Sequence, residues 1–314
     1  MEERNKQPTV HEQAYQPVFT VFTPTYNRAH TLHRVYESLQ AQTYRNFEWV
    51  VIDDGSIDNT CELVEQWRQE ANFTIRYFYQ ENSGKHIAVN RGVREAKGEL
   101  FLVLDSDDAC VSEALERFKE HWDLIPEDKK HRFSAVTCLC NDQNGEIVGS
   151  RFPFDPTDSD SLEIRYRYKV TGEKWGFHRT EVLRQFPFPE IVGEKTIPQG
   201  FVWGRIAREY KTRFINEPLR VYFSGTDQLT RLSPQQISLG HALWHKIILN
   251  EQSSWFWYAP FNFMRSAVHY SRFSFHTGIT VSEQFKMLNT RIGKFLLLGA
   301  LPVGYLVYCQ DRKE

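Results

Sequence analysis

The sequence has little cysteine, no excess of basic charge and no long uninterrupted apolar run. Five cysteines in 314 residues, an odd number, argue against a disulfide scaffold and fit core thiols in a reducing compartment. A net charge of −2 gives no reason to expect a nucleic-acid partner. No run reaches the roughly 20 apolar residues that a membrane-spanning helix needs. These absences favour a folded cytoplasmic protein.

Two nucleotide-binding signatures are also missing. No Gly-x-Gly-x-x-Gly follows the first apolar run, residues 18–23, which argues against a dehydrogenase. No Gly-x₄-Gly-Lys-Ser/Thr occurs anywhere, which excludes a P-loop enzyme. The N-terminal residues 1–16 are polar, lack the apolar core of a signal peptide, and are expected to be flexible.

The most informative feature that is present is an acidic cluster after an apolar run. Residues 100–104 are apolar, and Asp105, Asp107 and Asp108 follow them within four positions. Such a pattern predicts a buried strand whose carboxyl end binds a cation. Carboxylate oxygens suit Mg²⁺ or Mn²⁺ better than Zn²⁺. An acidic turn exposed to solvent is the alternative that the tetrad alone leaves open.

Strand and helix patterns alternate over the first 110 residues. Predicted strands cover 18–23, 47–52, 74–79 and 100–104, and predicted helices cover 29–41, 61–70 and 85–96. Strands separated by helices of this length indicate a mostly parallel sheet with helices on its faces. The polar segments that follow the four strands are then expected to meet at one edge of the sheet, where α/β proteins bind ligands.

The remainder of the chain is less regular. We predict a helix at 113–123, strands at 133–140, 212–215 and 219–223, a helix at 201–209, and an irregular loop at 150–170. Helical patterns dominate from residue 234, and Asp227 is expected to cap the helix that follows it. Three regions follow: a flexible N-terminus at 1–16, an α/β domain at 17–232 with halves 17–110 and 111–232, and a helical region at 233–314.

The sequence resembles glycosyltransferase family 2, whose members have the GT-A fold. The resemblance covers residues 18–110 and rests on four motifs in order. They are Phe22-Thr23-Pro24-Thr25-Tyr26-Asn27-Arg28, Val51-Ile52-Asp53-Asp54-Gly55-Ser56, Asn82-Ser83-Gly84-Lys85 and Leu104-Asp105-Ser106-Asp107-Asp108. The resemblance implies transfer of a sugar from a nucleotide-diphosphate donor to an acceptor hydroxyl, with inversion.

The resemblance also implies roles for individual residues. A nucleotide pocket would be formed by Pro24, Thr25, Tyr26, Arg28, Asp53, Asp54, Lys85 and Asp107. Asp105, Asp107 and Asp108 would hold Mn²⁺ or Mg²⁺. The acceptor side would include Trp175, His178, Gln199 and Trp203, although a core tryptophan and a structural histidine are equally ordinary interpretations of the first two.

The catalytic base is the position at which the chain departs from the family pattern. The family commonly places an acid immediately before a helix that carries an arginine, and this chain has Gln199-Gly200 there. A glutamine cannot accept a proton usefully at neutral pH. Glu194 is therefore the candidate base, with an ordinary loop acid as the alternative.

Two functions remain after the motifs are considered. The first is a metal-dependent glycosyltransferase of surface polysaccharide or glycolipid synthesis, with a UDP-sugar as the favoured donor and a carbohydrate or lipid-linked acceptor. The second is a non-catalytic subunit that binds a nucleotide sugar. Residues 295–308 form a fourteen-residue segment without charge, whose length suits either peripheral contact with the inner face of a membrane or packing in the core or against another subunit. The sequence predicts no oligomeric state.

Overall fold

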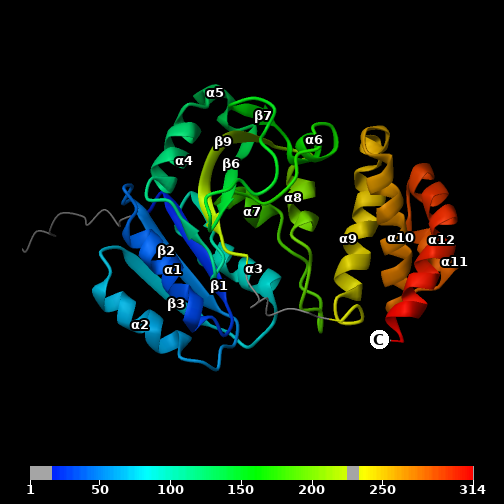
Figure 1. The fold of residues 1–314 in the computed structure, drawn as a ribbon, viewed down its shortest axis with the longest axis horizontal. Coiled ribbons are helices and arrows are strands. Elements are labelled where there is room, and N and C mark those ends of the chain that lie inside the picture. The colour runs from blue at the N-terminus through cyan, green and yellow to red at the C-terminus, as the bar shows by residue number, and fades with distance from the viewer. Residues whose placement is uncertain (1–15, 225–232, 314) are drawn as a thin grey trace, which may run out of the picture.

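The computed structural model describes residues 16–224 and 233–313, which form an α/β domain and a helical C-terminal region (Figure 1). The predicted flexible tail, apart from Gln16, and the predicted cap at Asp227 lie outside the described residues.

A sheet of nine strands forms the centre of the α/β domain. Its order is β3-β2-β1-β4-β8-β6-β9-β5, and β7 pairs with β9. The strands are β1 (Phe19–Thr25), β2 (Phe47–Asp53), β3 (Thr74–Tyr79), β4 (Leu100–Val103), β5 (Ala109–Cys110), β6 (Phe133–Asp142), β7 (Thr157–Ser159), β8 (Lys174–Arg179) and β9 (Lys211–Tyr222). β1 runs parallel to β2 and β4, and β2 runs parallel to β3. The parallel arrangement predicted for the first 110 residues is therefore confirmed, whereas β8 is antiparallel to both β4 and β6.

Helices cover both faces of the sheet and bury its apolar side chains. They are α1 (Ala29–Gln40), α2 (Thr60–Glu70), α3 (Lys85–Glu95), α4 (Ala114–Asp123), α5 (Glu127–Lys130), α6 (Ser161–Tyr166), α7 (Thr180–Gln185) and α8 (Gly200–Ile206). One core cluster joins β1 and β2 to α1, α2 and α4, and a second joins the sheet to α3, α7 and α8. Every residue of β1 and β2 is buried, because each strand has helices on both sides.

Two expectations for residues 150–223 are wrong, and two elements in this part of the chain were not predicted. The segment predicted as a loop at 150–170 contains β7 and α6, and Asp160 starts α6 by accepting hydrogen bonds from the N–H groups of Leu162 and Glu163. The two strands predicted at 212–223 are one strand, β9. Pro218 lies in β9 where the pairing with β6 shifts register, and there its missing N–H is tolerated. Strand β8 and helix α7 were not expected from the sequence.

The C-terminal region is helical, as predicted from residue 234. It contains α9 (Ser238–Glu251), a 3₁₀ helix (Ser253–Tyr258), α10 (Pro260–His276), α11 (Val281–Met287) and α12 (Arg291–Asp311). These helices stand beside the α/β domain, with α9 nearest to it (Figure 1). Tyr166 of α6 belongs to their apolar core, and its hydroxyl donates to the side chain of Gln252 at 2.8 Å. A continuous core therefore connects the two regions.

Helix α12 is longer than the predicted apolar segment, because it begins at Arg291 and ends at Asp311. The helix is long and apolar enough to cross a membrane by length and composition, with a mean hydropathy of 1.6. Only 28% of that apolar window is buried within the protein. Most of its apolar surface therefore lacks a partner among the described residues.

A cluster of histidines lies between α9 and α10. From it we predict that the C-terminal region becomes less stable as the pH falls. His245 and His269 stack at 5.1 Å, and their Nδ1 atoms are buried without a hydrogen-bond partner in the described parts of the chain. Burial, followed by His269, His241, Arg165 and Arg265, lowers the pKa of His245 from 6.5 to about 2. Burial, followed by Arg265, Arg272 and His241, lowers the pKa of His269 to about 4, and Asp311 opposes this weakly.

Because the unfolded chain binds these two protons near pH 6.5 and the folded chain does not, stability is complete above pH 6.5 and falls below it. We expect a loss of about 1 kcal/mol per histidine between pH 7 and pH 5.5. Urea unfolding at the two pH values measures the loss, and His245→Phe should reduce it. An equal loss in the wild-type chain and in His245→Phe would contradict this assignment.

Candidate functional site

The four polar strand-end segments meet at one edge of the sheet. The N–H of Asp54 donates to the carbonyl of Thr25 at 2.8 Å, which joins the ends of β1 and β2. The hydroxyl of Thr31 donates to the carbonyl of Ser106 at 2.9 Å, which joins the start of α1 to the acidic motif. The convergence predicted from the sequence is therefore present, because parallel neighbours end on the same side.

The two aspartates that end β2 hold the loops around them. Both Asp54 oxygens accept backbone N–H groups, from Ser83 at 2.9 Å and Gly84 at 2.8 Å. Asp53 accepts the N–H of Ser56 at 2.7 Å and the hydroxyl of Tyr77 at 2.7 Å. Each carboxylate is buried. Their predicted contact with a nucleotide base stays a prediction, and the contacts seen here fix the loops that would surround the base.

The segment after β1 contributes the other predicted nucleotide contacts. Pro24 and Thr25 lie in β1, where they pair with Ile52 and Asp53 of β2. The hydroxyl of Thr25 is buried and has no hydrogen-bond partner among residues 16–224 and 233–313. Tyr26 is exposed at 39% and is available to a ligand. Arg28 is buried, with its guanidinium 3.5 Å from the carboxylate of Asp107.

The acidic motif is bound by two cations from distant parts of the chain. Lys85, the first residue of α3, lies 2.6 Å from Asp105. Arg220 of β9 donates its Nε to Asp108 at 2.9 Å, makes a second contact with Asp108, and lies 3.3 Å from Asp105. Asp108 also accepts the N–H of Phe223 at 3.0 Å. The motif therefore contains two closely paired carboxylates and a more open one, Asp107, whose side chain is 37% exposed and lies 3.5 Å from Arg28.

These contacts set the ionisation of the paired carboxylates. Burial pushes the pKa of Asp105 upward, but the charges of Lys85 and Arg220 outweigh burial and leave it below its usual value. Burial raises the pKa of Asp108 to about 6, and Arg220 with the N–H of Phe223 opposes a further rise. Both groups are therefore negatively charged at neutral pH.

The carboxylates of the acidic motif fit a divalent cation that would be coordinated partly by the protein and partly by a substrate. No group of three His, Cys, Asp or Glu side chains in the described chain is arranged to enclose a metal. Mg²⁺ usually binds through one or two carboxylates together with substrate phosphates and water. Asp107 with Asp105 matches that arrangement, whereas the pairing of Asp108 with Arg220 favours a structural role for this third predicted ligand.

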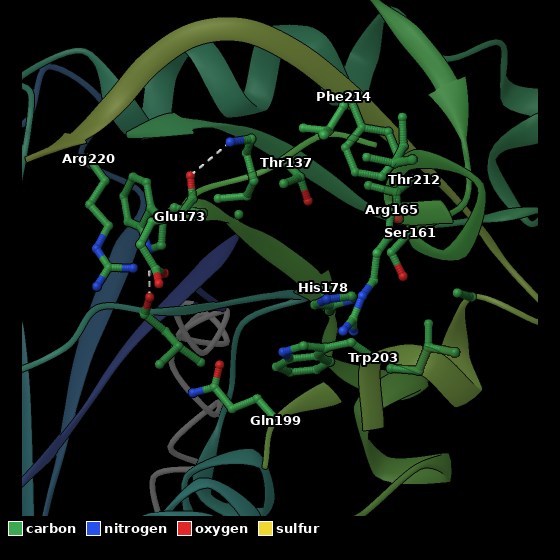
Figure 2. A pocket seen from close by; sticks show the side chains of 18 of the residues that line it. Thr137, Ser161, Arg165, Glu173, His178, Gln199, Trp203, Thr212, Phe214 and Arg220 are labelled. Carbon is green, nitrogen blue, oxygen red and sulfur yellow. Dashed lines mark hydrogen bonds between the residues drawn. The ribbon is translucent and has the colours of Figure 1, made fainter. Parts of the chain in front are cut away.

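A cavity of about 420 Å³ opens beside the acidic motif (Figure 2). Asp105 and Arg220 line it, as do the four residues predicted for the acceptor side, Trp175, His178, Gln199 and Trp203. The predicted acceptor residues therefore lie together. They come from β8, from the start of α8 and from α8 itself. Their roles toward an acceptor stay predictions.

Three of the wall residues are held firmly. The indole N–H of Trp175 donates to the carbonyl of Val103 at 2.6 Å. The rings of His178 and Trp203 stack 4.7 Å apart and almost parallel. Burial lowers the pKa of His178 to about 4, so its ring is neutral at pH 7. A flat aromatic wall of this kind suits the apolar face of a sugar.

Glu194, the predicted base, does not line the cavity. Its carboxylate is buried and accepts the N–H of Thr196 at 3.0 Å and the N–H of Gly240 at 2.9 Å. Both oxygens are therefore occupied by backbone groups. These contacts favour a structural role, in which Glu194 connects the segment before α8 to α9.

Most cavity residues were not predicted from the sequence, among them the charged residues Arg165, Glu173, Lys174 and Arg220. Arg220 lies between Leu219 and Val221 near the end of β9, and a charge between two apolar residues of a strand is a signal that could have been followed. Arg165 lies in a segment predicted to be a loop. Glu173 follows a glycine in a polar turn and carries no distinguishing local pattern.

Comparison with known proteins identifies the family. Residues 20–128 match the sequence model of Glycosyl transferase family 2. An uncharacterized glycosyltransferase of Nostoc sp. is 37% identical over 183 residues, covering 55% of this chain and 54% of the relative. The GalNAc(5)-diNAcBac-PP-undecaprenol beta-1,3-glucosyltransferase of Campylobacter jejuni is 26% identical and covers 75% of each chain. An uncharacterized glycosyltransferase of Rickettsia typhi is matched over only 32% of its length.

Solved structures agree on the fold. TarS of S. aureus, residues 1–349 in complex with UDP, superimposes with a TM-score of 0.63 at 19% identity, covering 94% of this chain and 91% of that one. Mannosyltransferase PcManGT of Pyrobaculum calidifontis, in complex with GDP-Man and Mn²⁺, gives a TM-score of 0.50 at 21% identity, covering 96% and 76%. Residues 20–128 therefore form a glycosyltransferase family 2 domain, and the chain as a whole has a GT-A fold with a helical C-terminal region.

Proposed function

We propose that this chain transfers a sugar from a nucleoside-diphosphate sugar to an acceptor hydroxyl, with inversion at the anomeric carbon. The observation that carries the proposal is that Asp105, which pairs with Lys85 and precedes the open carboxylate of Asp107, lines a cavity with an aromatic wall. A diphosphate at the motif would direct its sugar into the cavity, where an acceptor could approach the opposite face. UDP is the favoured nucleotide, since TarS binds UDP and UDP-GlcNAc.

In this proposal the residues of the site have different roles. Asp107 and Asp105 would hold Mg²⁺ or Mn²⁺, which neutralises a departing diphosphate. Lys85 adds a positive charge beside the same phosphates. Asp54 and the loop that it fixes would receive the base, and the stacked pair of His178 and Trp203 would orient the sugar or acceptor. Positioning of this kind lowers the barrier by removing the entropic cost of bringing the reactants together.

The test is a calorimetric titration of the purified chain with UDP, GDP and dTDP, each with and without Mn²⁺. Binding of one nucleotide that depends on Mn²⁺ supports the proposal and selects the sugar donors for turnover assays. Absence of binding by all three, with and without metal, would contradict it.

A non-catalytic subunit that binds nucleotide sugars is the second candidate. Gln199 favours it, because the cavity wall carries an amide where the family pattern has an acid. Binding of a donor without hydrolysis or transfer would support this function over the first.

We also propose that the acceptor is linked to a lipid and that α12 holds the chain at a membrane surface. The Campylobacter relative is named for an undecaprenol-linked substrate. On α12, Phe295, Leu298 and Leu306 are 74%, 64% and 63% exposed, and their spacing puts them on one helical face. Residues 253–314 contain seven lysines and arginines but three acidic residues, whereas the whole chain has a net charge of −2. A basic, apolar surface suits anionic lipid.

This membrane contact predicts a strong effect of charge on α12. Leu298→Glu or Leu306→Glu should weaken binding to vesicles containing phosphatidylglycerol at least tenfold, because burial of a leucine contributes about 1.5–3 kcal/mol. Leu124→Glu is the matched control, since Leu124 is 69% exposed at the end of α4 in the α/β domain. Vesicle co-sedimentation measures the effect. If the wild-type chain does not bind the vesicles and instead self-associates, α12 packs against a second copy of the chain.

A further inference from the structure

The cavity contains a free carboxylate that the family pattern does not predict. Two acidic side chains line it among the described residues, Asp105 and Glu173. Asp105 is engaged by Lys85 and Arg220. Glu173 makes no ion pair with any residue in 16–224 or 233–313 and is exposed. Glu173 is therefore the cavity carboxylate that is available to a substrate.

The turn that carries Glu173 is fixed against a second turn. Gly172 has a φ of +80°, and a Cβ there would lie 2.2 Å from the carbonyl oxygen of Val148. Gly149 is equally close to the carbonyl oxygen of Thr171. The N–H of Ser150 donates to that same carbonyl at 3.1 Å, and the hydroxyl of Ser150 accepts the N–H of Thr171 at 2.9 Å. Two glycines at close contact therefore hold this turn in place.

Lys174 strengthens the same turn from the other side. Its ammonium donates to the carbonyl of Thr171 at 2.7 Å and to the carbonyl of Glu173 at 3.2 Å. The ammonium is thus occupied by backbone oxygens and forms no ion pair with the carboxylate of Glu173 within the described chain. Burial lowers the pKa of Lys174, and the charges of Cys140 and Glu173 oppose that effect without close contact. The side chain of Glu173 starts from a rigid position and ends in the cavity.

Glu173 lines the cavity in which the sugar and the acceptor would lie. Figure 2 shows it toward the Arg220 side, with Arg165 on the opposite side. Burial raises the pKa of Tyr222, and the charge of Glu173 raises it further, as do Asp108 and Asp107. The charges of Glu173 and of the acidic motif therefore both reach the hydroxyl of Tyr222.

We propose that Glu173 is the general base of the transfer, in place of the acid that is missing at Gln199. The inference rests on the proposed glycosyl transfer. The carboxylate of Glu173 takes the proton of the acceptor hydroxyl as that oxygen forms a bond to the anomeric carbon. The bond between the anomeric carbon and the phosphate oxygen breaks, and its electron pair leaves with the nucleoside diphosphate. No further reactant is required.

The experiment compares Glu173→Gln with the wild-type chain and with Glu209→Gln. Glu209 is exposed in the turn that follows α8 and does not line the cavity. The assays are UDP titration and hydrolysis of UDP-glucose, UDP-galactose, UDP-GlcNAc and UDP-GalNAc with Mn²⁺, in which water replaces the acceptor. We expect Glu173→Gln to lower kcat by 10²–10⁴-fold with little change in KM or UDP affinity. The acidic limb of the pH–rate profile should disappear in that variant, and Glu173→Asp should recover part of the rate.

The outcomes separate this inference from the proposed function. Normal UDP binding with unchanged hydrolysis by Glu173→Gln overturns the role of Glu173 and leaves the transferase intact. If the wild-type chain binds UDP but does not hydrolyse any of the UDP-sugars, the role of Glu173 is also overturned, and the non-catalytic binding subunit is favoured. Absence of nucleotide binding by the wild-type chain overturns both proposals. A reduced rate with an unaltered pH profile means that Glu173 only shapes the cavity, which also overturns the inference.

Discussion

Replacing Asp107 by alanine should abolish metal-dependent binding of UDP and lower turnover by about 10²–10³-fold. Asp107 is the most open carboxylate of its motif, with a side chain that is 37% exposed and 3.5 Å from Arg28. Its removal takes a ligand from the cation and leaves the buried guanidinium of Arg28 without its ion-pair partner. Because the two charges are 3.5 Å apart and the carboxylate is partly exposed, the loss of stability should lie between the roughly 1 kcal/mol of an exposed pair and the roughly 3–5 kcal/mol of a buried one.

The measurement pairs calorimetry, with and without Mn²⁺, with a thermal melt of the same sample. Asp128→Ala is the matched control, since Asp128 is exposed in α5 and distant in sequence from the motif. Retention of Mn²⁺-dependent affinity by Asp107→Ala would show that another group holds the cation. A large drop in melting temperature would instead make Asp107 a structural residue, like its neighbour Asp108.

The donor half of the site could be predicted because its signals are local. Asp105 and Asp107 directly follow an apolar strand, and Asp54 directly follows another. Parallel pairing of β2 and β4 with β1 then brings these residues to one edge without further information. The hydrophobic pattern of the strands and their parallel direction are therefore enough to place the donor residues. A short turn keeps a side chain close to the end of the strand that it follows.

The acceptor half could not be predicted in the same way, because its contacts join distant segments. Arg220 reaches Asp108 across 112 positions, and Glu194 reaches the N–H of Gly240 across 46. Nothing in the residues around Glu194 distinguishes a carboxylate that faces substrate from one that binds backbone. Glu173 was missed for the same reason, since its exposure to the cavity depends on the contact between two glycine turns.

The largest effect on stability is expected from Arg220→Met. The guanidinium is 8% exposed and binds Asp108, which is 1% exposed, as well as Asp105. Methionine keeps much of the length and the apolar stem but leaves Asp108 with a single N–H donor, that of Phe223. Breaking a buried ion pair by removing one partner costs about 3–5 kcal/mol. Arg220→Met should therefore unfold at a much lower urea concentration than the wild-type chain. The difference should be present in the absence of UDP.

A second substitution and a change of pH distinguish unpaired charge from lost packing. Asp108→Asn combined with Arg220→Met should recover part of the loss, because an amide carries no charge into the interior. Burial already raises the pKa of Asp108 to about 6, and removing Arg220 removes a group that lowers it. An acid whose pKa is raised by folding costs stability as pH rises through the interval between its two pKa values. The deficit of Arg220→Met should therefore shrink as pH falls from 7 to 5.

The control is Arg208→Met, which breaks a half-exposed pair with Glu251 and should cost no more than about 1 kcal/mol. Equal urea midpoints for Arg220→Met and Arg208→Met would show that the acidic motif is stable without its cation. A deficit that stays constant with pH would attribute the loss to packing. The predicted pattern instead divides the four-residue motif into two parts: Asp108 secures β9 to the sheet edge through Arg220, and Asp107, one position earlier, stays open for the donor.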